Sequence, residues 1–181
     1  MKHYNLIFTA LMARGDIRII HPIDEAFTAS FIVDSGTAAQ ALAGEPTKAD
    51  DAAAASPWTG EAGIMVDGDG STAQRFTGIA KSDSTETSSA AGVVVTYLPL
   101  PSIIYRAKAK TATAVDTAAE LNTYMGKRVV FDLTSSSWTI DTEAADAVAN
   151  CVTIVGGDHN TSTIHFVYAF KGTYLGFCIS A

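Results

Sequence analysis

Two short stretches contain residue types that could bind a metal ion. The first is VDGDGS at residues 66–71, where two carboxylates lie among glycines, as they do in calcium-binding loops. An EF-hand loop needs a glutamate at its twelfth position, and counting from Asp67 this position holds Gly78. The flanks are β-prone, and Asp-Gly is a strong hairpin signal. We therefore expect the tip of a hairpin rather than a calcium site.

The second stretch could also transfer protons. Asp158 and His159 are adjacent, and His165 follows on a run of alternating residues. They could form an acid–base dyad or a weak metal site, although a solvated turn histidine and a half-buried strand histidine are commoner. The chain has no nucleophile elbow, His-Glu-x-x-His, Cys-x-x-Cys or glycine-rich phosphate loop. We expect no enzyme, with no catalytic residue, no metal ligand and no cofactor.

One cluster of positive charge stands out in a chain with a net charge of −7. Arg106, Lys108 and Lys110 alternate with small residues, so they share one face of a strand, and Lys127 and Arg128 could join them. The row is either a solvated strand face or a patch that docks on an acidic protein surface. The acidic balance argues against direct contact with nucleic acid. No run approaches the roughly 18 apolar residues needed to cross a bilayer.

The chain has 181 residues, 48% of them hydrophobic and 17% charged, which suits one packed domain with an extension. Residues 34–56 are mostly Ala, Gly, Thr and Asp, with little to bury. Such a stretch is either an ordinary surface loop or a segment fixed by a partner subunit, and we favour the partner. The predicted division is residues 1–57, holding the first strands and an extended arm, and residues 58–181, a β-domain.

The β-domain should consist of many short strands. Residues 93–100, 103–110, 129–140 and 151–179 contain β-branched or alternating runs, and residues 129–140 have the pattern of a hairpin. GGDHN at residues 156–160 is expected to form a turn. One helix is expected: Thr117 and Glu120 have capping-box spacing, and Ala118, Leu121 and Met125 would share a face. The predicted fold is mainly β, a small barrel or sandwich with one short α-helix and an extended N-terminal arm.

The two cysteines fall in β-like runs far apart in the sequence. Cys151 and Cys178 could pair only if their strands were adjacent. Because no secretory signal is recognisable, we expect two small buried thiols.

The order of several phrases resembles that of decoration (cement) proteins of tailed phages. These phrases are GIA followed by DST, then VTYLPLP, YRAKA, the small capped helix, GKRVVFDLT and a late VGGD, within residues 71–169. The resemblance implies a structural virion protein that binds the outer capsid surface and stabilises the head by clamping major capsid protein subunits. It would be assembled in the host cytoplasm, and its partners would be the major capsid protein and neighbouring copies of itself, for example in a trimer.

Under this reading Arg106, Lys108 and Lys110 are expected capsid contacts. The alternative is a phage tail or head-fibre module that contacts the host surface.

Overall fold

The computed structural model describes residues 17–21, 28–33, 41–48, 63–64, 76–100, 102–134, 136–147 and 150–168. These residues are mainly in strands, as predicted. Their regular elements, in chain order, are β1 (Arg18–His21), β2 (Thr28–Val33), β3 (Pro46–Lys48), β4 (Gly63–Ile64), β5 (Phe76–Ala80), β6 (Gly92–Tyr97), β7 (Ile104–Ala109), η2 (Ala112–Ala114), α1 (Ala118–Thr123), β8 (Arg128–Thr134), β9 (Ser137–Asp141), β10 (Val152–Asp158), η3 (His159–Thr161) and β11 (Thr163–Tyr168). Within this part of the chain no helix is both long and apolar enough to cross a membrane.

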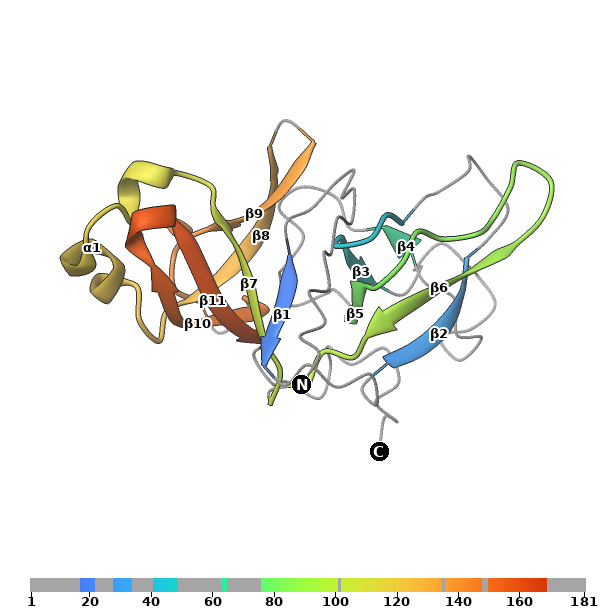
Figure 1. Cartoon of the computed structure of the whole chain (residues 1–181), viewed down its shortest axis with the longest axis horizontal. Coiled ribbons are helices and arrows are strands. Elements are labelled where there is room, and N and C mark those ends of the chain that lie inside the picture. The colour runs from blue at the N-terminus through green and yellow to red at the C-terminus, as the bar shows by residue number, and fades with distance from the viewer. Residues whose placement is uncertain are drawn as a thin grey trace, which may run out of the picture.

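Five strands close into a small barrel (Figure 1). Their order is β7-β11-β10-β8-β9 with antiparallel neighbours, and a parallel pairing of β9 with β7 completes the ring. One edge of β7 pairs with β11. The other edge is shared, because β1 pairs with Ile104–Arg106 and β9 pairs with Lys108 and Ala109. Of the two predicted alternatives, barrel or sandwich, the barrel is confirmed, and β1 adds a sixth strand to the same sheet along one edge of β7.

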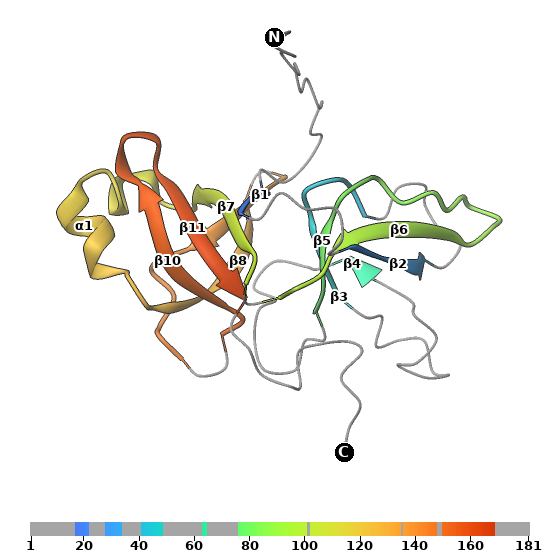
Figure 2. The same ribbon diagram turned by 60° about the horizontal axis from the view of Figure 1, so that its bottom comes forward.

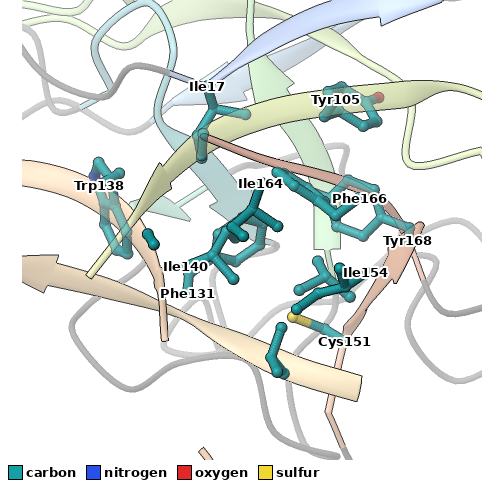
Figure 3. Close-up of a cluster of buried hydrophobic side chains, with 14 of the residues drawn as sticks. Ile17, Tyr105, Phe131, Trp138, Ile140, Cys151, Ile154, Ile164, Phe166 and Tyr168 are labelled. Carbon is teal, nitrogen blue, oxygen red and sulfur yellow. The ribbon is translucent and has the colours of Figure 1, made fainter. Parts of the chain in front are cut away.

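Large aromatic side chains fill the barrel interior (Figure 3). The Tyr105 and Tyr168 rings meet edge to face with centroids 5.5 Å apart, and Phe131 meets Phe166 at 5.6 Å. Cys151 is fully buried in the same cluster, as predicted. Aromatic pairs in these arrangements are worth about 0.5–1.5 kcal/mol beyond the area they bury. The barrel is therefore held by a continuous packed core.

Strand β7 shows the predicted alternation. Tyr105 and Ala107 are buried in the barrel, whereas Arg106 and Lys108 are exposed on its outer face. The predicted hairpin is also confirmed, since β8 and β9 pair from Val130 to Asp141.

A second sheet lies beside the barrel in both views (Figures 1 and 2). Its strand order is β2-β6-β5-β3-β4, and every neighbouring pair is antiparallel. Strands β2 and β3 come from residues 1–57 and pair with β6 and β5, while β1 pairs with β7. The predicted boundary after residue 57 is thus crossed by backbone pairing in both sheets. The rest of the expected arm, residues 1–16, 22–27, 34–40 and 49–57, lies outside the described residues.

Buried contacts join the sheet to the barrel. The indole N–H of Trp138 in β9 donates to Glu45 Oε1 at 3.3 Å, and Glu45 is only 1% exposed. Ile79 of β5 belongs to the same apolar cluster as the barrel residues. The Tyr105 hydroxyl donates to the Leu98 carbonyl at 2.7 Å, which ties the connection between β6 and β7 to the barrel. Ile79 thus carries one residue of the second sheet into the barrel core, while that sheet also has a separate buried cluster of its own: Phe31, Val33, Ala41, Ala80 and Val94.

Helix α1 begins as the sequence predicts. The Thr117 hydroxyl accepts from the Glu120 amide, and the Glu120 carboxylate accepts from the Thr117 amide, each at 3.2 Å. The predicted apolar face is wrong in part. Leu121 is buried, but Ala118 and Met125 are exposed, because the helix ends two residues before Met125 and covers the barrel through a single side chain.

The glycines after residue 155 form strand rather than turn. The sequence pattern predicts a turn over residues 156–160, yet β10 continues to Asp158 and the chain turns through η3. A Cβ on Gly157 would lie 2.5 Å from the Thr163 carbonyl oxygen. The glycine is therefore needed for the close approach of β11, and this prediction was wrong because a sequence does not show such an approach.

Candidate functional site

A row of basic side chains crosses the outer face of the barrel. In the antiparallel pairing of β1 with β7, Arg18 lies opposite Arg106, and in that of β7 with β11, Arg106 lies opposite His165. Directly opposed residues point to the same side of a sheet, so the three side chains form a line across three strands. Lys108 follows two residues further along β7 and therefore shares this face. We call Arg18, Arg106, Lys108 and His165 the basic face.

The basic face borders a surface hollow of about 280 Å³. Its lining consists of Arg18, Arg106, Ala107, Lys108, Thr161 and Thr163. The loop that leads from β10 to β11 forms one wall, and the hydroxyls of Thr161 and Thr163 hydrogen-bond each other there at 2.9 Å. The Lys108 amine donates to the Thr161 carbonyl, which fixes the amine at that wall. The hollow is thus lined by cations and hydroxyl groups.

The two arginines of the basic face lack an ion pair in the described part of the chain. The ion pairs found there join Lys110 to Asp132 and Asp141, and Arg128 to Asp146. Arg18 and Arg106 are both exposed. Their positive charges are consequently free to act on a ligand.

His165 is half-buried at the end of the row. Burial lowers its pKa from the ordinary value of 6.5, and the charge of Arg106 lowers it further, while Asp158 acts in the opposite direction. Gly156 lies opposite His165 on β10 and leaves space for the ring. The neutral imidazole is therefore favoured, so the charge of the basic face at neutral pH comes from the arginines and the lysine.

The structure brings together two of the three predicted contact residues. Arg106 and Lys108 line the hollow; Lys110 continues their alternation and is exposed, but its amine is held by acidic side chains, so it is not part of the basic face. Strand β7 ends at Ala109, and the Lys110 amine lies 2.7 Å from Asp132 and 3.1 Å from Asp141. The hydrogen bond to Asp132, followed by that to Asp141, is the main cause of the raised pKa of Lys110. Lys110 has a structural partner within the barrel.

Lys127 and Arg128, which the sequence left as further members, are also engaged elsewhere. The Lys127 amine donates to the Thr142 carbonyl at 2.7 Å and lies 5.0 Å from the centroid of the Tyr124 ring. Arg128 pairs with Asp146 at 3.2 Å. They hold the loop after β9 rather than extend the basic face.

Sequence reasoning missed Arg18. It lies 88 residues before Arg106 in a segment grouped with the arm, and only the pairing of β1 with β7 brings the two together. The alternation of Ile17, Arg18 and Ile19 was a local signal for one outward arginine, but it does not name the opposing strand.

Asp158 and His159 have a local structural role. The Asp158 carboxylate accepts hydrogen bonds from the Asn160 amide at 3.0 Å and from the Thr161 hydroxyl at 2.9 Å. The bond from Thr161 is the main cause of the lowered pKa of Asp158, and the bond from Asn160 lowers it further. Asp158 thereby caps η3 at the wall of the hollow. Among the described residues no three His, Cys, Asp or Glu side chains gather where they could hold a metal ion. The VDGDGS stretch at 66–71 and Cys178 lie outside those residues.

Comparisons with known proteins add no relative. A scan against family models, a search of curated proteins and a search of solved structures found no match to this chain.

Proposed function

We propose that this chain is a structural virion protein that binds the outside of a phage capsid and stabilises the head by clamping major capsid subunits. Two lines of reasoning support the proposal. The phrases between residues 71 and 169 resemble those of decoration proteins. Arg18 and Arg106, which form no ion pair among the described residues, also lie on the outer face of the barrel, whose interior is filled by side chains.

The observation that carries the proposal is the pair Arg18 and Arg106, exposed side by side without an ion pair among the described residues. An acidic chain that concentrates free cations on one face is suited to meet an acidic protein surface, where charge sets orientation and encounter rate. Many copies on a lattice then add their individual contacts through effective concentration.

The test uses heads of the encoding phage that lack this protein, mixed with the purified full chain. We expect the protein to sediment with the heads in proportion to the number of capsid subunits, and to raise the temperature at which the heads release DNA. A tail or head-fibre module would instead be present in few copies per particle and leave that temperature unchanged. Absence of binding to heads would refute the proposal.

A further inference from the structure

The hollow beside the basic face has the chemistry of a carboxylate-binding site. We propose that it takes an extended acidic segment of the capsid partner, with Asp or Glu at every second position. This inference rests on the proposed function, because that function supplies the partner, but the carboxylate site itself can be tested separately.

The basic face lowers the stability of the free protein. Like charges directly opposite each other on neighbouring strands destabilise a sheet. Here Arg18 opposes Arg106, and described residues form no ion pair with either guanidinium, although the chain has 19 acidic residues and 12 basic ones. Uncompensated repulsion of this kind is typical of binding sites, where stability is lower than the sequence could make it. A bound anion would remove the repulsion.

The donor groups around the hollow suit carboxylate ligands. A guanidinium presents a planar fork of donors that matches the two oxygens of a carboxylate, and an ammonium adds a compact charge. Arg18, Arg106 and Lys108 supply these groups, and Thr161 and Thr163 add hydroxyls. A water molecule occupies about 30 Å³ in the liquid, so a hollow of about 280 Å³ has room for more than one carboxylate. The hollow can therefore accommodate a ligand with more than one acidic group.

The spacing of the cations matches the side-chain repeat of an extended peptide. Arg106 and Lys108 are two residues apart on one strand face, which separates their Cα atoms by about 6.7 Å. An extended peptide projects side chains from one face at the same repeat, so acidic groups at alternate positions can meet both cations. Arg18 widens the site by one strand spacing, about 4.8 Å. A strand-like acidic segment lying over β7 satisfies all three cations.

The experiment measures fluorescence anisotropy of a labelled peptide in which Asp and Ser alternate, titrated with the full-length protein at low salt. An isomer of the same composition, with its Asp residues contiguous, is the peptide control. We expect Arg18→Gln and Arg106→Gln each to weaken binding of the alternating peptide about tenfold or more. Arg106→Lys should lose part of the affinity, because it keeps the charge but not the fork.

The matched protein control is Arg128→Gln. It removes the same charge from the same barrel, but from a residue that already pairs with Asp146. This variant should bind the peptide like the wild type, and circular dichroism should show that all variants fold. Equal weakening by Arg128→Gln, full affinity in Arg106→Gln, or no preference for the alternating peptide would overturn the inference. Tighter binding of inorganic phosphate or of single-stranded DNA would do the same.

The same variants, mixed with heads, separate this inference from the proposed function. If wild-type protein and Arg106→Gln decorate heads equally well, the hollow is not the capsid contact and the inference fails while the function stands. If the wild type binds the alternating peptide but not heads, the function fails while the carboxylate site stands.

Discussion

Replacing Lys110 by Met should destabilise the barrel without touching the basic face. The side chain of Asp132 is only 8% exposed, and it forms an ion pair with the Lys110 amine at 2.7 Å. A hydrogen bond to a charged group contributes about 1.5–3 kcal/mol, and removing one member of a fully buried pair costs about 3–5 kcal/mol. The Lys110 side chain is 38% exposed and Asp132 keeps the hydrogen bond from the Thr134 hydroxyl, so the lower range applies. We expect a loss of about 2 kcal/mol.

Urea unfolding followed by circular dichroism measures this loss. With a denaturant slope of about 2 kcal/mol/M, the midpoint should fall by roughly 1 M. Lys108→Met is the matched control: it makes the same substitution two residues earlier, and because the Lys108 amine donates an exposed hydrogen bond to the Thr161 carbonyl rather than pairing with a buried carboxylate, its cost should stay at about 0.5–1 kcal/mol. Because hydrogen bonds to Asp132 and Asp141 raise the pKa of Lys110, the lysine stays charged around neutral pH, and substitution is the sharper perturbation.

A double variant tests the same pair of side chains in a second way. Adding Asp132→Asn to Lys110→Met removes the buried charge that has lost its Lys110 partner, so part of the lost stability should return, and a double-mutant cycle gives the coupling between the two side chains. Equal midpoints for Lys110→Met and Lys108→Met, or a further loss in the double variant, would show that Asp132 does not depend on Lys110.

Two further predictions concern the second sheet and the edge of the basic face. Gly78→Ala should unfold the chain or lower the free energy of unfolding in urea by more than about 4 kcal/mol, because Gly78 has φ +138° and a Cβ there would lie 1.8 Å from a carbonyl oxygen of β6. Gly126→Ala is the control: Gly126 has φ +78° and a Cβ there would meet nothing within 4 Å, so the loss should be only about 1 kcal/mol. The stability contributed by keeping His165 neutral is fully present above pH 6.5 and is lost as the pH falls through its lowered pKa, since burial and Arg106 outweigh Asp158. Wild type should therefore lose more thermal stability than His165→Gln between pH 7.5 and pH 5, and parallel curves would exclude this linkage.

Local patterns were sufficient to predict much of the barrel. The alternation of residues 103–110 identified β7 and which of its side chains face outward, and the Thr117 capping box located the start of α1. These features depend on residues close in sequence, whose spacing fixes their relative direction. The alternation also holds at Lys110, which is exposed after buried Ala109, but the pattern did not show that its amine pairs with Asp132 and Asp141.

The site could be predicted only in part because it depends on strand pairing. Arg106 and Lys108 are visible as a basic pair in the sequence, but Arg18 reaches them through the pairing of β1 with β7. The burial of Asp132 was hidden for a similar reason: it occupies a polar position in an alternating run, and the cation beside it comes from Lys110, the residue that follows β7. Neither pairing leaves a local trace, so neither could be inferred without the topology.

The cations on the barrel surface fall into two groups that mutation should separate. Lys110 and Arg128 have acidic partners within the barrel, so neutralising either one breaks an ion pair and lowers stability. Arg18 and Arg106 oppose each other, so neutralising one removes a repulsion, and any loss should appear in binding. A chain selected only for stability would have little reason to keep the second group. The position of Arg18 and Arg106 on the face that borders the hollow is the physical argument for the proposed anionic partner.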